Sequence, residues 1–230
     1  MAALRLQIIP SRGTRVRCED IPNFPSQVIS ADLVDLDESA TRRIADLYTQ
    51  LEEEGKIEIT KILKVRQEIE ILKVPAFVEI ANDRLAQGFS VGVFVNFRAT
   101  IEAISKALNC DFIDGSVTGS KRDAIIAAFQ RNDSRCLALN SDAAGLSISL
   151  QDLTGDAPRF GVVSPTWSAT VFRQLTGRFR RQGGKSRSFF QVLFAAGTVE
   201  TKMHRALRGK LNALDSLNDN DLQPNNLHMD

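Results

Sequence analysis

The stretch VGVFVNFRATIEAISKALN, residues 91–109, decides the fold class because two periodicities meet inside it. Residues 91–97 form a short, nearly continuous apolar run, which is typical of a β-strand buried on both faces. Residues 98–109 follow at once with the apolar spacing of an α-helix. A buried strand that leads directly into a helix is the repeating unit of an α/β protein with a parallel sheet.

The same unit recurs downstream with different lengths. Further strands are predicted at residues 110–114, 135–140, 159–164 and 188–194. Helices are predicted at residues 120–132, 168–177 and 198–217, and a loop with glycine and serine follows the strand at 135–140. Strands that alternate with helices of about a dozen residues imply right-handed crossovers. We therefore predict an α/β fold with a parallel sheet of about five or six strands flanked by helices.

The N-terminal third has a different character. Residues 1–30 contain three prolines and predict an extended lead-in. Residues 31–88 hold three helical patterns, the first capped by Asp37 or Ser39, and we expect them to pack on the following lobe. Residues 89–216 then form the α/β lobe, and the polar residues 217–230 are expected to form a flexible tail.

Bulk composition is that of an ordinary globular protein. The 230 residues are 43% hydrophobic and 25% charged, and the net charge of +1 gives the whole molecule no bias toward nucleic acid. Three scattered cysteines without a Cys-x-x-Cys pair predict free buried thiols in a reducing compartment, with neither a disulfide framework nor a zinc site. No signal pattern and no apolar run of about 18 residues occurs, so we expect no membrane span and an intracellular location, in cytoplasm, nucleoid or nucleus.

The segment QLTGRFRRQGGKS, residues 174–186, raises the question of nucleotide binding. Its end, Gly184-Lys185-Ser186, matches the end of a phosphate-binding loop, but that loop needs a glycine where this chain has Phe179. The loop must also run from a strand into a helix, whereas the order here is helix, loop, strand. The segment is therefore not a phosphate loop, and a small phosphate-loop kinase is disfavoured.

The arginines of the same segment offer another chemistry. Gln174, Gly177, Arg178 and Arg181 form the pattern Q-x-x-G-R-x-x-R, in which helical spacing would place both arginines on one side of a helix end. A guanidinium can donate two parallel hydrogen bonds to phosphate oxygens. As an arginine finger, it stabilises the negative charge that develops during phosphoryl transfer. The alternative is a solvated basic patch, because the segment and its surroundings hold six cations and no acid. Composition alone leaves both interpretations open.

Five ordered segments together resemble the second RecA-like lobe of superfamily 2 helicases, in particular the remodeller-type (sucrose-non-fermenting family) DNA translocases. The resemblance extends over roughly residues 28–217. VGVFVNFRATIEAIS resembles motif IV, IDGSVTGSKRDAIIAAFQ the next family block, and LALNSDAAGLSISLQDL motif V. SPTWSATVFRQLTGRFRRQGG resembles the tryptophan segment with motif VI, and AAGTVETKMHRALRGKLNAL the helix after the last strand. The chain departs from the family pattern at residues 143–147 and 180–184.

The resemblance implies roles for individual residues. Arg178 and Arg181 are the expected catalytic arginines, with Arg181 favoured as the finger, and nucleotide contacts are expected from Gln174, Gly177, Asp142 and Gly145. The carboxyl ends of parallel strands collect ligands, and short polar residues there suit nucleic-acid phosphates. The candidates for these contacts are Asn96, Phe97, Arg98, Gly115, Ser116, Asn140 and Ser141, which are otherwise ordinary caps and turns. Trp167 either stacks on a base or fills the core, and the cations near residues 202–210 either face DNA or are solvated.

The sequence contains neither a phosphate loop nor an acidic magnesium-binding box after a strand. The resemblance assigns both to a first lobe, which would bind most of the ATP and magnesium. We therefore expect a second motor lobe of an ATP-dependent DNA translocase or helicase, inactive alone, which acts on DNA, double-stranded by family preference. The first RecA-like lobe would be supplied in cis or in trans, depending on whether the chain is a fragment or one half of a split enzyme. The alternative is a stand-alone, catalytically inactive module that binds nucleic acid or a partner.

Overall fold

The computed structural model describes residues 18–55, 58–141 and 148–217, and the described elements alternate between strands and helices after a helical lead-in. The helices are η1 (Cys18–Asp20), α2 (Glu38–Glu53), α3 (Glu58–Leu72), α4 (Val74–Ala86), α5 (Arg98–Leu108), α6 (Gly119–Gln130), α7 (Ala169–Thr176) and α8 (Val199–Leu217). The strands are β1 (Gln27–Val34), β2 (Ser90–Val95), β3 (Asp111–Ile113), β4 (Cys136–Asn140), β5 (Arg159–Val163) and β6 (Ser188–Ala195).

The six strands form one parallel sheet in the order β1-β6-β5-β2-β4-β3. Strand β2 lies in the middle, between β5 and β4, and all of its residues are buried. The predicted α/β class and the strand count are therefore confirmed. Because every strand points the same way, the segments that follow the strands meet at one edge of the sheet, the edge at which ligands collect in such folds.

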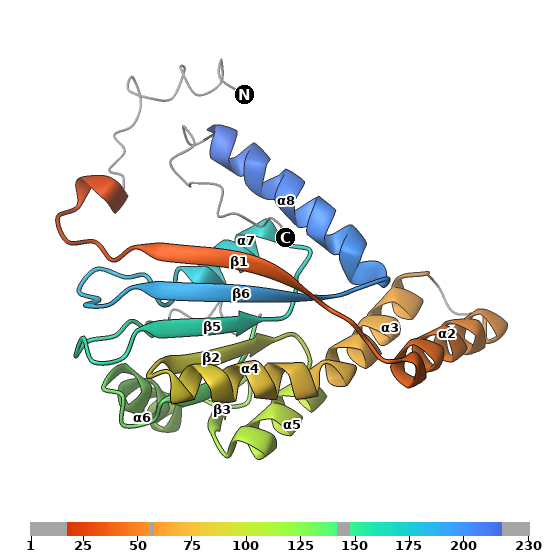
Figure 1. Ribbon diagram of the computed structural model, residues 1–230, viewed down its shortest axis with the longest axis horizontal. Helices are drawn as coiled ribbons and strands as arrows, with labels where there is room; N and C mark the ends of the chain where they lie inside the picture. Colours follow the sequence, from red (N-terminus) through yellow and green to blue (C-terminus); the bar gives the residue numbers. More distant parts are fainter. Residues whose placement is uncertain (1–17, 56–57, 142–147, 218–230) are drawn as a thin grey trace.

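Helices cover both faces of the sheet (Figure 1). On one face, α4 and α5 pack on the central strands through a cluster that includes Phe77, Ile101 and Val93. On the other face, residues of α6, α7 and α8 join the largest cluster, which includes Phe129, Phe172 and Leu207. A smaller cluster joins α2 and α3 to Ala195 at the carboxyl end of β6. The three helical patterns predicted within residues 31–88 are confirmed as α2, α3 and α4, and Asp37 caps α2 by accepting a hydrogen bond from the Ala40 amide.

Strand β1 is an element that the sequence analysis did not predict. It lies within residues that were expected to be an extended lead-in and the start of a helical segment, and the proposed boundary at residue 30 falls inside it. It pairs along its whole length with β6, from Gln27 opposite Ser188 to Val34 opposite Ala195. The extended conformation was thus expected for its first residues, but the sheet pairing was not.

Two paired glycines open a slot in the sheet. Gly92 of β2 lies opposite Gly161 of β5, and their missing side chains make room for the rings of Phe179 and Phe190. A Cβ atom at Gly161 would lie 2.3 Å from the Phe190 ring, and one at Gly92 would lie 2.7 Å from the Phe179 ring. The two phenylalanine rings stack with centroids 5.1 Å apart. The slot holds the residues after α7 against the middle of the sheet.

Candidate nucleotide and nucleic-acid interface

Three predicted nucleic-acid-contacting segments meet at the carboxyl edge of the sheet. The Asn140 side-chain amide, at the end of β4, donates to the carbonyl of Asn96 after β2 at 3.1 Å. Arg98 at the start of α5 reaches Asp114 after β3, with 3.5 Å between guanidinium and carboxylate. Asn96, Arg98 and Asn140 therefore lie close together, as the sequence predicted from their positions after parallel strands.

Glu70 of α3 satisfies the donors that this edge was expected to offer to phosphate. Its buried carboxylate accepts the backbone amides of Asn96 and Phe97, each at 3.0 Å, and the Asn96 side-chain amide at 2.7 Å. An anion thus already lies at the N-terminus of α5, where a helix dipole favours one. The donors of Asn96 and Phe97 can bind a nucleic-acid phosphate only if Glu70 moves away.

The turn after β3 is built around Asp114. Its carboxylate accepts the Ser116 hydroxyl at 2.5 Å and the Ser116 amide at 2.9 Å, while Gly115 and Ser116 stay exposed. The Ser116 hydroxyl bond, together with the nearby Arg98 guanidinium, holds the pKa of Asp114 below its ordinary value. The turn therefore presents exposed backbone, but it also places a carboxylate beside any phosphate that Arg98 would bind.

Ser141 follows β4 and is buried. Its amide donates to the Val95 carbonyl at 2.8 Å, and its hydroxyl has no hydrogen-bond partner among the described residues. The neighbouring motif V candidates, Asp142 and Gly145, lie outside the described residues, so their predicted nucleotide contacts stay predictions.

Arg178 is a buried cation. Its side chain is 5% exposed, its Nη1 donates to the Ile148 carbonyl at 3.0 Å, and its Nε has no partner among residues 18–55, 58–141 and 148–217. Burial, and then the charge of Arg181, lower the pKa of Arg178. No carboxylate of the described residues forms an ion pair with either arginine. One of the two guanidinium groups is desolvated, and the described residues place no acid beside either. This arrangement favours the binding of an anion.

Arg181 is exposed, whereas Arg178 is buried. The prediction that helical spacing would align the two is wrong, because α7 ends at Thr176 and Gly177 serves as its C-cap. The chain then turns so that Phe179 enters the slot described above, Arg178 points inward and Arg181 remains in solvent. Between them, Arg180 donates from Nε to the Pro25 carbonyl at 2.9 Å and lies over the Phe24 ring.

The other residues of the motif VI segment have structural surroundings. Gln174 is exposed on α7, where it can reach a ligand, and Gly177 completes the backbone cap of that helix. Trp167 is partly buried against the main core cluster, which favours the packing role that the sequence left open. The Lys210 ammonium donates to its carbonyl at 2.8 Å and ties α8 to the loop before α7.

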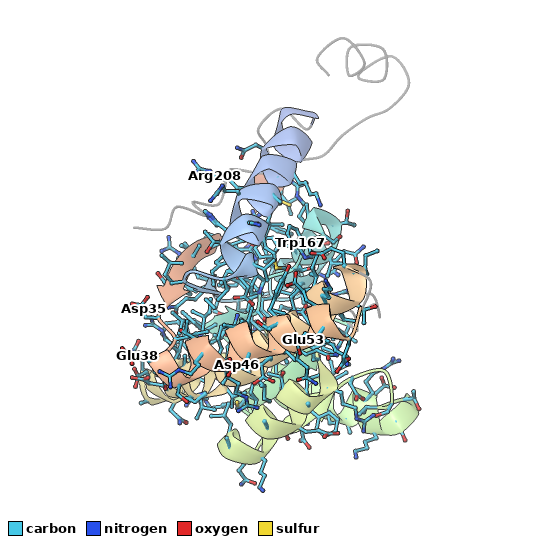
Figure 2. All side chains as sticks on the ribbon, turned by 90° about the vertical axis from the view of Figure 1, so that its right-hand side faces the viewer. Asp35, Glu38, Asp46, Glu53, Trp167 and Arg208 are labelled. Atoms are coloured by element: carbon cyan, nitrogen blue, oxygen red, sulfur yellow. The ribbon has the colours of Figure 1, made fainter. Side chains whose placement is uncertain are left out.

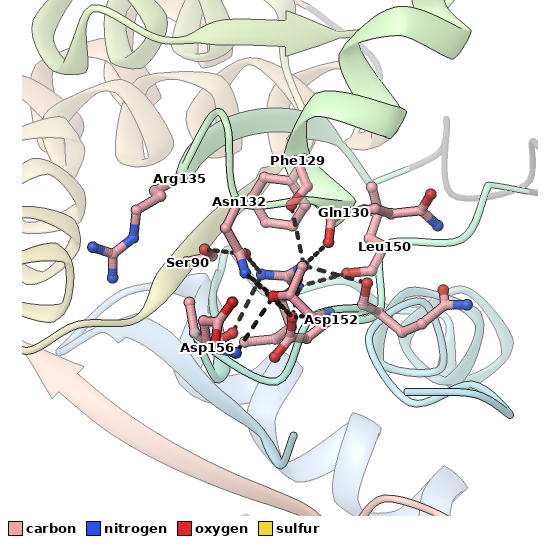
Figure 3. Close-up of polar contacts among 12 residues, drawn as sticks. Ser90, Phe129, Gln130, Asn132, Arg135, Leu150, Asp152 and Asp156 are labelled. Atoms are coloured by element: carbon pink, nitrogen blue, oxygen red, sulfur yellow. Dashed lines mark hydrogen bonds and ion pairs between the residues drawn. The ribbon is translucent and has the colours of Figure 1, made fainter. Parts of the chain in front are cut away.

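A buried arginine at the opposite edge of the sheet fixes the segment that leads into β5 (Figure 3). Arg159 donates to the carbonyls of Leu150, Phe129 and Gln130 and to the side chain of Asn132. Burial lowers the pKa of Arg159 to about 10. Because the Leu150 amide in turn donates to the Arg178 carbonyl, this network holds the backbone on which Arg178 rests. Neither Arg159 nor Glu70 was predicted from the sequence. The one signal for each of them is a charged residue at a position where its strand or helix is otherwise apolar.

Charged side chains divide between two helices on the outside. Figure 2 shows Asp35, Glu38, Asp46 and Glu53 on and beside α2, and Arg208 on α8. The exposed charges of α8 over residues 199–212 are all basic, namely Lys202, Arg205, Arg208 and Lys210. Phosphate would therefore be attracted along α8 and repelled along α2.

Neither a metal centre nor a membrane-spanning helix occurs within residues 18–55, 58–141 and 148–217. They contain no cluster of three or more histidine, cysteine or acidic side chains arranged to hold a metal ion. None of the helices described in these ranges has the length and apolar character needed to cross a membrane.

Comparison with known families gives a match to part of the chain. Residues 72–183 match the family model of the helicase conserved C-terminal domain. This range runs from the end of α3 to the residues after α7 and therefore contains Arg178, Arg181 and the carboxyl ends of β2, β3 and β4.

A curated protein and a solved structure are similar to the chain. A protein of Acanthamoeba polyphaga mimivirus, named as a candidate ATP-dependent RNA helicase, is 35% identical over 221 residues, which is 91% of this chain. The chain spans 41% of that protein's length. The crystal structure of the C-terminal part of the Fun30 ATPase domain superposes with a TM-score of 0.51 at 20% identity, over 65% of this chain and 52% of that one. The likeness to that structure concerns the fold.

Proposed function

We propose that the chain is the second, RecA-like motor lobe of an ATP-dependent superfamily 2 helicase or translocase that acts on nucleic acid. The match of residues 72–183 to the helicase conserved C-terminal domain supports this proposal, and the likeness to the Fun30 structure supports the fold. A first lobe with a phosphate loop and an acidic motif would bind most of the ATP and the magnesium ion. This chain would close on that nucleotide and supply positive charge to its phosphates.

The observation that carries the proposal is the Arg178 and Arg181 pair. A desolvated guanidinium beside a second cation is costly unless an anion completes the site, and the described residues provide none. A polyphosphate matches both the charge and the forked geometry of guanidinium groups. Exposed Arg181 would reach the phosphate that is transferred, while Arg178 would hold the adjoining backbone and add fixed charge behind it.

Nucleic-acid contacts are proposed at two places. The carboxyl edge offers Arg98, Gly115, Ser116 and Ser141, and α8 offers its basic side chains. Such contacts would be to the phosphate backbone, so affinity should depend strongly on salt and weakly on sequence. The sequence resemblance favours double-stranded DNA, whereas the name of the viral relative refers to RNA. We therefore propose that the lobe binds the backbone of a duplex. A binding competition between DNA and RNA duplexes would show which of the two it prefers.

The test is nucleic-acid-stimulated ATP hydrolysis by this lobe joined to, or mixed with, a RecA-like lobe that carries a phosphate loop. Arg181→Ala should lower kcat by about 10³-fold or more, as expected for an arginine finger, with the melting temperature unchanged because the side chain is exposed. Arg187→Ala removes another exposed arginine outside the pattern and is the matched control. Equal kcat values for Arg181→Ala and wild type would refute the catalytic role.

A second candidate function is a stand-alone, catalytically inactive module that binds nucleic acid or a partner. The exposed charges of α8 over residues 199–212 favour it, because they are all basic and need no nucleotide to attract phosphate. The two functions differ in one result. A motor lobe restores hydrolysis when it meets its first lobe, whereas a binding module binds duplex with the same affinity in the presence and absence of that lobe and of ATP.

A further inference from the structure

Two cysteines that are separated in sequence by the whole of α6 come together at the amino ends of β3 and β4. Asp111 of β3 is paired with Leu137 of β4, so Cys110 and Cys136 are neighbours on the preceding rung of the parallel pair. Adjacent strands lie about 4.8 Å apart, which is within the range of Cα separations that a disulfide spans. Because side chains alternate along strands, both sulfur atoms lie on the face covered by α4 and α5.

The two thiols influence each other. Cys136 donates a hydrogen bond to the Cys110 sulfur, and this bond is the main reason why the pKa of Cys110 lies below its ordinary value. The reciprocal effect and burial raise the pKa of Cys136. Cys110 is also the more exposed of the two thiols, so it is the one that a solute in solvent can reach, while Cys136 is its buried partner.

Solvent reaches the pair through a pocket of about 560 Å³. Both cysteines line it, together with Leu85, Lys106, Asp111 and Arg135. Cys18, the third cysteine, lies before β1 at the other edge of the sheet and does not line this pocket.

We propose that Cys110 and Cys136 form a reversible dithiol–disulfide site, oxidised by hydroperoxides that enter this pocket. The Cys110 thiolate attacks one peroxide oxygen, and hydrogen peroxide is thereby reduced to water as Cys110 becomes a sulfenic acid. The Cys136 thiol then attacks the Cys110 sulfur, which forms the S–S bond and releases a second water. A low-molecular-weight thiol reverses the reaction by exchange and is itself oxidised to its disulfide.

The test is oxidation of the whole chain by one equivalent of hydrogen peroxide, followed by non-reducing peptide mapping and intact-mass measurement. Wild type and Cys18→Ser should lose two titratable thiols and the mass of two hydrogen atoms, yield a Cys110–Cys136 linked peptide, stay monomeric, and recover with dithiothreitol. Cys110→Ser should consume peroxide at least about tenfold more slowly. Cys136→Ser should leave a Cys110 sulfenic acid that dimedone traps.

The proposal is overturned if wild type keeps three titratable thiols, if the linked peptide contains Cys18 or joins two chains, or if the products are sulfinic and sulfonic acids without a disulfide. The peptide maps of wild type and Cys18→Ser test the proposal even if substitution of Cys110 or Cys136 disturbs folding. A further readout is the alkylation rate of the native chain, in which Cys110 should react ahead of Cys136.

Discussion

The ring of Phe179 lies among Phe94, Phe129 and Phe190, with centroid separations between 5.1 and 6.1 Å. Its position decides the directions of the arginines beside it, because a buried ring at this point forces Arg178 inward and leaves Arg181 in solvent. The segment that carries both arginines is thus held by the apolar contacts of the Phe179 ring, together with the hydrogen bond from Arg178 to the Ile148 carbonyl. The sequence revealed both arginines but not that one is buried and the other exposed, since this depends on glycines in other strands.

Gly161→Ala is expected to destabilise the chain by about 1–3 kcal/mol, because the new methyl group overlaps the Phe190 ring and overpacks the slot. Urea unfolding followed by circular dichroism would measure the free energy of unfolding. Gly209→Ala is the matched control. Nothing lies near its Cβ position on the exposed side of α8, so helix propensity should raise stability by about 0.5–1 kcal/mol. Losses of equal size in both variants would refute the overpacking argument.

Residue roles at the carboxyl edge were predictable only in part. Asn96, Arg98 and Asn140 could be placed together because each lies at or just after the end of a strand in a parallel sheet. This inference uses only the order of strands and helices along the chain. Glu70 could not be placed there, because the contact comes from a helix that packs across the ends of other elements. Its position between apolar residues of α3 was the available clue, and a charge at such a position predicts a buried partner.

At the scale of elements, the junction of α3 and α4 joins the helical lead-in to the sheet. Lys73 is fully buried there, and its ammonium donates to both carboxylate oxygens of Glu200 on α8, at 2.9 and 2.7 Å, and to the Leu193 carbonyl at 2.9 Å. Glu200 also accepts the Ala195 amide at 2.7 Å. Glu70 and Lys73, one helical turn apart, thus bind the ends of two different strands, β2 and β6.

Lys73→Met should lower the free energy of unfolding by about 3–5 kcal/mol, because it leaves the Glu200 carboxylate buried without its cation. The double variant Lys73→Met with Glu200→Gln should recover part of that loss, and a double-mutant cycle from urea unfolding gives the coupling energy. Arg131→Met removes an exposed ion pair with Asp133 and should cost less than about 1 kcal/mol. Additive losses in the cycle would show that the buried pair is not coupled.

Strand β1 shows where element prediction failed. Its residues alternate between exposed Val28 and Ser30 and buried Ile29 and Ala31, which is an edge-strand pattern with only one well-covered face. The interior strands were predicted because both of their faces are apolar, and that pattern stands out in a sequence. An edge strand has a weaker pattern, and the prolines before it favour a loop.

At the scale of the whole molecule, charge is segregated although the total is +1. The exposed charges of α8 over residues 199–212 are all basic, whereas α2 carries acids together with Arg42 and Arg43. Figure 2 shows Glu38, Asp46 and Glu53 on α2 and Arg208 on α8. Local potential, and not net charge, governs where a polyanion binds. The sequence predicted α8 and its cations but left their role open, and their binding to nucleic acid is a proposal that charge substitution can test.

Arg205→Gln combined with Arg208→Gln should weaken duplex binding and reduce the slope of log affinity against log salt by about 0.9 for each phosphate that is no longer neutralised. Fluorescence anisotropy of a labelled duplex at several salt concentrations measures both quantities. Arg42→Gln combined with Arg43→Gln makes the same change in net charge on α2 and should leave the slope unaltered. If the two double variants have equal effects, binding responds to overall charge and α8 is not the binding surface.

The pairing of β1 with β6 also governs how the chain must acquire its structure. Gln27 contacts Ser188 across a sequence separation of 161 residues, and every other rung of that ladder is similarly remote. Contacts of this kind close large loops before they yield stabilisation, and they slow folding. During synthesis at about 5–20 residues per second, β1 waits roughly 8–30 s for its partner strand β6 to emerge. Throughout that interval its backbone donors and acceptors and its apolar side chains are open to molecular chaperones and to other nascent chains.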